Sequence, residues 1–230
     1  MRSSIQGIIF DLDDTLIPST IIYEKALRAI GLGLKQPLYL RARQQVKDRL
    51  GRRHVSARNR ALYVQEVLEL QKKFSAEAAL RMLETYENVL AREIRFAWKK
   101  LRRDLLFRRL ARRCKLIILS NENSRTQLLK LRAIDPRSQY FSALITSESV
   151  GHEKPHPKMF ARALKLAGLR AKQVCMVGDD FKRDIAPAMK LGMSGVLTTE
   201  FSVVKRTPVS KRPRWLTVTR LDELGPHFLK

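Results

Sequence analysis

The stretch FDLDDTL at residues 10–16 directly follows a short apolar run rich in isoleucine. A run of this kind that ends abruptly in polar residues predicts a strand buried in a parallel sheet. Three aspartates, Asp11, Asp13 and Asp14, therefore come together at the end of a buried strand. Their charges repel one another in a partly desolvated place, and a hard divalent cation such as Mg²⁺ would remove that cost. Because aspartate and Thr15 also cap helices well, a helix-capping run is the alternative.

Six short apolar runs lie along the chain, and each is followed by polar residues. Three of the runs have a strong pattern of a buried strand, and three have a weaker one. The strong runs lie at 7–10, 115–119 and 173–177, and the weaker ones at 143–146, 195–198 and 215–219. Helical patterns lie between the runs, and strands that alternate with helices imply right-handed crossovers. The sequence therefore predicts an α/β fold with a doubly wound parallel sheet.

Two of these helical patterns carry signals for where the helix begins. Pro157 occupies the position of a first-turn proline. Ser124 and Gln127 have the Ser-x-x-Gln spacing of a capping box, which predicts that a helix opens there.

Residues 18–104 show no strand pattern but several amphipathic helical ones. In the longest, apolar side chains recur at helical spacing with charged residues between them. These side chains are Leu80, Leu83, Tyr86, Leu90 and Ile94. A helical segment inserted after the first strand must fold as a unit of its own, and we expect it to cover the strand ends, where open α/β sheets bind ligands. We therefore predict a core of residues 1–17 and 105–230 and an α-helical cap of residues 18–104.

Polar residues also follow the second strong strand and precede a later helix. Ser120 and Asn121 bring a hydroxyl and an amide to the same edge of the sheet, although both are ordinary loop residues. Lys154 lies just before the helix that begins at Pro157, where it would supply a cation for phosphate. A lone lysine is more often a solvated surface residue.

The third strong strand again runs into carboxylates, in the order Gly178, Asp179, Asp180 and, four residues later, Asp184. Gly178 permits a sharp turn at that point. The three aspartates either join the first cluster at the edge of the sheet or cap the following helix.

Taken together, these motifs resemble those of the haloacid dehalogenase-like hydrolase superfamily. All four of that family's motifs are present in the family's order. They are FDLDDTL at 10–16, LSN at 119–121, GHEKPHP at 151–157 and VGDDFKRD at 177–184. The insertion between the first two motifs is similar to the helical C1 cap of one subfamily, and the interval between the second and third leaves no room for another cap. The later motifs look closest to a branch that includes nucleotide phosphatases and a sialic-acid-phosphate phosphatase.

The resemblance implies the following roles. Asp11 attacks phosphorus and forms an aspartyl-phosphate, for which a carboxylate is an adequate nucleophile. Asp13 donates a proton to the leaving oxygen and later takes one from water. Mg²⁺ is held by the Asp11 carboxylate, the Asp13 backbone carbonyl and Asp179.

The phosphoryl group is bound, by the same resemblance, at Ser120, Asn121 and Lys154, where a hydroxyl and a cation offset its charge. Asp184 is expected to orient Lys154 or the water shell of the metal rather than to bind the metal directly. The supporting residues are Asp14, Thr15, Asp180 and Asp184, of which Asp180 departs from the small polar residue often found at its position.

The predicted function is that of a magnesium-dependent phosphomonoester hydrolase that acts on a small phosphorylated metabolite, a nucleotide or a sugar phosphate. A phosphosugar mutase would use the same residues if the phosphoryl group returned to the sugar. A dehalogenase is disfavoured because the dehalogenases of this family lack the second aspartate, and Asp13 is present here.

The formal net charge of +24 is the unusual bulk property of the chain. Residues 18–113 hold 24 Lys and Arg against 9 Asp and Glu. A positive surface attracts polyanions and speeds the approach of phosphorylated molecules. A phosphatase or binding protein that acts on nucleic acid is therefore an alternative, but it is not favoured because no aromatic-interleaved basic motif accompanies the charge.

The composition favours a cytoplasmic protein without membrane insertion. No apolar run approaches the roughly 20 residues that a transmembrane helix needs. The start of the chain does not have the pattern of a secretory signal. Cys114 and Cys175 are isolated, as expected for buried thiols in a reducing compartment.

Overall fold

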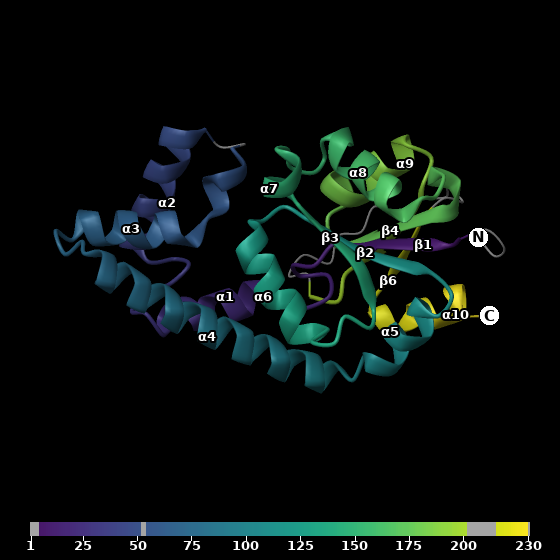
Figure 1. Cartoon of the computed structure of the whole chain (residues 1–230), viewed down its shortest axis with the longest axis horizontal. Helices are drawn as coiled ribbons and strands as arrows, with labels where there is room; N and C mark the ends of the chain where they lie inside the picture. The colour runs from purple at the N-terminus through teal and green to yellow at the C-terminus, as the bar shows by residue number, and fades with distance from the viewer. Residues whose placement is uncertain (1–4, 52–53, 202–214, 230) are drawn as a thin grey trace.

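The computed structural model describes residues 5–51, 54–201 and 215–229, and a six-stranded sheet lies at its centre (Figure 1). All neighbouring strands are parallel, in the order β3-β2-β1-β4-β5-β6. The strands are β1 (Gly7–Phe10), β2 (Lys115–Ser120), β3 (Phe141–Thr146), β4 (Val174–Gly178), β5 (Ser194–Thr198) and β6 (Trp215–Val218). Each of the six predicted runs forms a strand, and the predicted fold class is confirmed.

Helices cover both faces of this sheet (Figure 1). Residues of α8 and α9 pack on one face, and residues of α5, α6 and α10 on the other. The helices of the described residues are α1 (Ser19–Arg28), α2 (Pro37–Leu50), α3 (Arg60–Leu70), α4 (Ala76–Leu101), α5 (Asp104–Ala111), α6 (Ser124–Ile134), α7 (Ser147–Val150), α8 (Pro157–Ala167), α9 (Ala186–Lys190) and α10 (Leu224–Phe228). Short 3₁₀ turns occur at η1 (Val55–Arg58), η2 (Ala171–Gln173) and η4 (Leu221–Glu223), and a π turn at η3 (Phe181–Ile185).

Side chains along β1 alternate between the two apolar clusters that lie on opposite faces of the sheet. Ile9 points into a cluster formed with residues of α8 and α9. Ile8 and Phe10 point to the opposite face, into a cluster formed with residues of α5, α6 and α10. Because successive side chains of a strand point to opposite faces, a strand buried on both sides must be apolar throughout, as this one is.

Helices begin at both predicted places, Ser124 and Pro157, but the first is capped by a different residue than predicted. Pro157 is the first residue of α8, as predicted. The predicted capping box at Ser124 is wrong, because the N-cap of α6 is Asn123, whose side chain accepts a hydrogen bond from the backbone N–H of Thr126. Gln127 therefore takes no part in capping the helix. Its side-chain amide instead donates hydrogen bonds to Asp13 and Ser120 at the ends of β1 and β2.

The predicted helical insertion is present. The chain forms α1, α2, η1, α3 and α4 between β1 and β2, and its described residues contain no strand in that interval. These helices lie together beside the sheet, and α4 runs back from them beneath α6 (Figure 1). Leu80, at the start of α4, is 60% exposed, so the buried side of this helix begins only near Tyr86. The limits of 1–17, 18–104 and 105–230 for core and cap stay a prediction.

Arg103 ties the return of the insertion to the sheet. Its side chain is completely buried just before α5. The guanidinium donates a 2.9 Å hydrogen bond to the carbonyl of Leu16, where the chain enters the insertion, and forms an ion pair with Glu200 after β5. Both connections of the inserted helices are thus held at one point.

The strand order decides where a ligand can bind. The chain places β2 on one side of β1 and β4 on the other, so the loops after β1 and β4 diverge at the centre of the sheet. In open α/β sheets such a switch point forms a crevice at the carboxyl ends of the strands. No helix in the described parts of the chain has an apolar stretch of the length needed to cross a membrane.

Candidate active site

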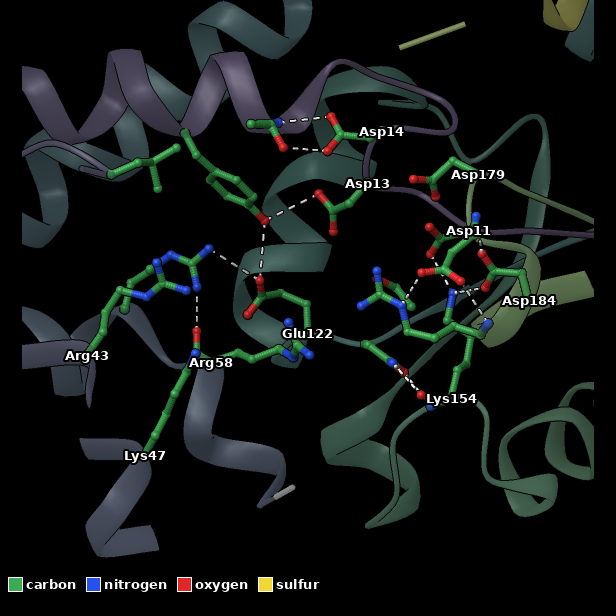
Figure 2. Close-up of a pocket in the computed structure, with 18 of the residues that line it drawn as sticks. Asp11, Asp13, Asp14, Arg43, Lys47, Arg58, Glu122, Lys154, Asp179 and Asp184 are labelled. Carbon is green, nitrogen blue, oxygen red and sulfur yellow. Dashed lines mark hydrogen bonds and ion pairs between the residues drawn. The ribbon is translucent and has the colours of Figure 1, made fainter. Parts of the chain in front are cut away.

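A pocket of about 280 Å³ lies at this switch point, between the strand ends and the inserted helices. Residues that follow β1, β2 and β4 form one side, together with Lys154. Residues of α2, η1 and α3 form the other side. Figure 2 shows Asp11, Asp179 and Asp184 gathered near Lys154, with Arg43 and Lys47 across the pocket.

Lys154 lies between two carboxylates at the base of the pocket. Its Nζ is 2.6 Å from Oδ1 of Asp11 and 2.7 Å from Oδ1 of Asp184, and its side chain is 3% exposed. Burial by itself would lower the pKa of Lys154, but the two carboxylates outweigh it and raise that pKa above its ordinary value. Lys154 is therefore a permanent cation at the point where Asp11 faces the pocket.

Three carboxylates meet beside this lysine. Asp11, Asp179 and Asp184 each offer an oxygen atom, and these atoms lie within 4.8 Å of one another. Burial, followed by the charges of Asp11 and Asp184, raises the pKa of Asp179 to about 8. Burial and the charge of Asp11 also raise the pKa of Asp184, to about 6, although Lys154 opposes this rise. One lysine does not neutralise three carboxylates, and such an oxygen-only set suits Mg²⁺.

The sequence after β4 produces this approach locally. A Cβ atom on Gly178 would lie 2.5 Å from a carboxylate oxygen of Asp184, so only glycine leaves room for that side chain. Asp180 accepts hydrogen bonds of 2.9 Å from the backbone N–H groups of Lys182 and Arg183. Its side chain also forms an ion pair with Arg183 at 2.7 Å. Asp180 thus caps the turn that carries Asp184.

The carboxylate of Asp13 lies apart from the cluster, within a buried hydrogen-bond network. It forms an ion pair with Lys130, accepts a 2.8 Å hydrogen bond from Nε2 of Gln127, and accepts a 3.2 Å bond from the hydroxyl of Tyr23. Burial would raise the pKa of Asp13, but Lys130 outweighs burial and the pKa is about 2. Asp13 is expected to contact a metal through its backbone carbonyl, which the side-chain direction does not affect.

Two of the residues predicted to bind phosphate, Ser120 and Asn121, form hydrogen bonds with other residues of the site. Ser120 is buried, and its Oγ accepts a hydrogen bond from Gln127. The amide of Asn121 donates to the carbonyl of Lys154 at 2.8 Å and accepts from its backbone N–H at 2.6 Å. Asn121 therefore holds the Lys154 loop in place, although it also lines the pocket.

Asp14 and Thr15 shape the turn after β1. Asp14 has a φ of 54°, and its carboxylate accepts a 2.9 Å hydrogen bond from the backbone N–H of Thr20. The hydroxyl of Thr15 donates to Oδ1 of Asp179 at 3.1 Å. The Thr15 contact connects the first motif to the fourth across the end of the sheet.

A family model for haloacid dehalogenase-like hydrolases matches residues 5–192. The chain belongs to the haloacid dehalogenase-like hydrolase family. Its relatives include a ribulose-1,5-bisphosphate 5-phosphatase of Halopiger xanaduensis, which is 30% identical over 204 residues, 83% of each chain. A glyceraldehyde 3-phosphate phosphatase of Methanocaldococcus jannaschii is 28% identical over 199 residues, 82% of each chain.

The fold of this hydrolase is similar to that of solved structures of other proteins. The crystal structure of a 2-haloacid dehalogenase from Pseudomonas syringae pv. Tomato DC3000 matches it with a TM-score of 0.70. The match covers 98% of each chain at 24% sequence identity. A likeness at that identity extends to the fold and not to the reaction.

Several residues that line the hydrolase's pocket were not predicted from its sequence, and neither were two that contact Asp13. The pocket residues are Tyr23, Arg43, Lys47, Arg58, Arg60 and Glu122, and the two that contact Asp13 are Gln127 and Lys130. All are polar or charged residues of helices and loops, which ordinarily face water. Gln127 and Lys130 do share one helix face after the second motif, and that spacing is the one signal the sequence offers.

Proposed function

We propose that this hydrolase removes phosphate from a small phosphorylated sugar through an aspartyl-phosphate intermediate on Asp11, with Mg²⁺ as its cofactor. The observation that carries the proposal is the position of the Asp11 carboxylate. It lies at the base of the pocket, beside a buried cation and within a carboxylate cluster. A carboxylate becomes an adequate nucleophile for phosphorus once the charge of the phosphate is neutralised.

Two observations support a small sugar phosphate as the substrate. The relatives that match most of the chain bear the names of phosphatases for glyceraldehyde 3-phosphate and ribulose-1,5-bisphosphate. The pocket volume of about 280 Å³ lies just below the roughly 300–1,000 Å³ range of ligand pockets. Its size suits a metabolite of a few carbons better than a nucleic-acid strand, so we do not favour a nucleic-acid substrate.

The carboxylates of Asp11 and Asp179 and the backbone carbonyl of Asp13 would hold Mg²⁺, which when bound offsets the charge of the phosphoryl oxygens. The hydroxyl of Ser120 and the ammonium of Lys154 bind the remaining phosphoryl oxygens. Asp184 keeps Lys154 in position.

In the first step a carboxylate oxygen of Asp11 forms a bond to phosphorus as the bond to the sugar oxygen breaks. Asp13 gives its proton to that sugar oxygen, which leaves as an alcohol. In the second step Asp13 takes a proton from water, and the resulting hydroxide attacks phosphorus and frees Asp11 and inorganic phosphate.

Asp13 must carry a proton for the first step. In the free protein its pKa of about 2 keeps it ionised beside Lys130. Movement of the carboxylate away from Lys130 and the approach of an anionic substrate both raise that pKa. A dehalogenase reaction, in which halide leaves carbon, needs no such acid, and the presence of Asp13 therefore favours phosphate transfer.

The test measures the release of inorganic phosphate from glyceraldehyde 3-phosphate and from ribulose-1,5-bisphosphate, with Mg²⁺ and with excess chelator. We expect hydrolysis that needs Mg²⁺ and that Asp11→Asn reduces by more than about tenfold, or 1.4 kcal/mol of barrier. Asp222→Asn, at an exposed aspartate, serves as the matched control. Release of no phosphate by the wild-type protein, or full activity of Asp11→Asn, would contradict the proposal.

A further inference from the structure

The inserted helices contribute an excess of positive charge to the pocket. Four cationic residues of the insertion line it, and no aspartate or glutamate of the described insertion residues does. Arg43 and Lys47 come from α2, and Arg58 and Arg60 from the junction of η1 and α3. Under the proposed function the reacting phosphate would bind at the opposite side, beside Lys154, and its binding would not account for these four cations.

Two of the four, Arg58 and Arg60, form ion pairs with carboxylates of loops outside the insertion. Arg58 forms a two-pronged ion pair with Glu153, with N···O distances of 2.7 and 3.2 Å. Arg60 lies 3.5 Å from the carboxylate of Glu122 and donates to the carbonyl of Arg58. These pairs dock the insertion on the core and leave little charge for a ligand.

Arg43 has no such match. Arg43 lines the pocket, and no carboxylate of the described residues forms an ion pair with it. An anionic ligand group in the pocket would supply the acceptor that balances its charge. The second cation of α2, Lys47, follows Arg43 by four residues and therefore lies on the same helix face.

The side chain of Arg43 is also held in place. Its guanidinium carbon lies 5.7 Å from the centre of the Tyr39 ring and 5.8 Å from that of Tyr63. Both tyrosines are buried, and their rings pack edge to face with centroids 5.9 Å apart. A guanidinium that rests against a rigid aromatic wall is already ordered before a ligand binds, which reduces the entropy cost of binding.

We propose that Arg43 and Lys47 form a second anion subsite that binds an anionic group at the end of the substrate remote from the phosphate that is removed. The inference rests on the proposed function and narrows its substrate class. The preferred substrates are small sugar phosphates with a second anionic group, either a phosphate or a carboxylate. Arginine binds both groups through paired charge-assisted hydrogen bonds. Figure 2 shows Arg43 and Lys47 across the pocket from Asp11, as two ends of one ligand require.

The test measures binding in the Asp11→Asn background with Mg²⁺, so that no turnover interferes. Isothermal titration compares two matched pairs of ligands. Glyceraldehyde 3-phosphate and 3-phosphoglycerate differ by an aldehyde in place of a carboxylate, and ribulose 5-phosphate and ribulose-1,5-bisphosphate differ by one phosphate. We expect the more anionic member of at least one pair to bind about tenfold more tightly, and the pair with the larger ratio identifies the preferred anion.

The added variants examine Arg43 directly. Arg43→Gln is expected to remove most of this preference, and Arg43→Lys to retain part of it because the charge remains. Arg41→Gln, at an exposed position of the same helix, is the control and should leave the preference unchanged. Thermal unfolding of each variant shows that it is folded.

Equal affinity within both pairs would overturn the inference, and so would an Arg43→Gln variant that weakens both members of a pair equally. Neither result depends on catalysis. If the wild-type protein hydrolyses sugar phosphates but shows no preference for a second anion, the proposed function stands and the subsite fails. If the preference is present but no phosphate is released, the subsite stands and the proposed function fails.

Discussion

Replacing Lys154 with methionine removes one ammonium group and keeps the length of the side chain. The ammonium lies 2.6 Å from Asp11 and 2.7 Å from Asp184, and the side chain is 3% exposed. Removal of one partner from a buried ion pair costs about 3–5 kcal/mol, because the remaining charges stay buried and unpaired. We expect the lower end of this range, since the carboxylates can take up a proton.

For a domain of this size, 1 kcal/mol changes the melting temperature by about 2–4 °C. The Lys154→Met protein should therefore melt about 6–12 °C below the wild type in chelator. The difference should be smaller with Mg²⁺, because a bound cation replaces part of the lost charge. The rate of phosphate release should fall about 10²–10³-fold, as when one stabilising donor is removed from an active site.

The assay is thermal unfolding by calorimetry, in chelator and in Mg²⁺, with phosphate release measured on the same samples. Lys165→Met, on the exposed side of α8, is the control and should shift the melting temperature by no more than about 2 °C. A Lys154→Met protein that melts within about 2 °C of the wild type in chelator would refute the reasoning.

Two further predictions concern the protonation of the site. The pKa of Asp179 is about 8, well above the 3.8 expected in the unfolded chain. Between these values the folded protein holds a proton that the unfolded chain releases, so its stability in chelator should fall as pH rises from about 4 to 8. Asp179→Asn should flatten this dependence of the melting temperature on pH, and an unchanged slope would contradict the assignment. Lys130→Met should raise the pKa of Asp13 from about 2, because burial is then opposed less. Carboxyl-carbon NMR titration measures this, and an Asp13 pKa that stays near 2 would be the contrary result.

The sequence predicts the sheet well because a parallel sheet is buried on both faces. Each strand is then a short run of apolar residues that few other structures require. The same rule brings the motifs together, since the carboxyl ends of parallel strands share one edge. The proximity of Asp11, Asp179 and Lys154 follows from their places after β1 and β4 and before α8, without knowledge of any other contact.

Gln127 shows where local reasoning fails. Its spacing from Ser124 satisfies the rule for a capping box, but Asn123 performs the capping one residue earlier. The side chain of Gln127 is then available for Asp13 and Ser120. The start of this helix could be capped either by Ser124 with Gln127 or by Asn123. The contacts of Gln127 with Asp13 and Ser120 favour capping by Asn123.

The basic residues of α2 show a second limit. Arg41 and Arg43 are identical side chains two positions apart, yet Arg41 is exposed and Arg43 lines the pocket. Helical periodicity predicts that they lie on different faces. It does not predict which face meets the pocket, because that depends on how α2 packs against α3 and on the rings of Tyr39 and Tyr63.

The most direct test of the central claim is to trap the covalent intermediate. The wild-type protein is mixed with ribulose-1,5-bisphosphate and Mg²⁺, quenched in acid within milliseconds, digested and analysed by mass spectrometry. We predict one added phosphoryl group on the peptide that contains residues 10–16, located on Asp11, with no such peptide from Asp11→Asn. Rapid release of phosphate without any phosphorylated Asp11, or by the Asp11→Asn protein at the wild-type rate, would contradict the mechanism.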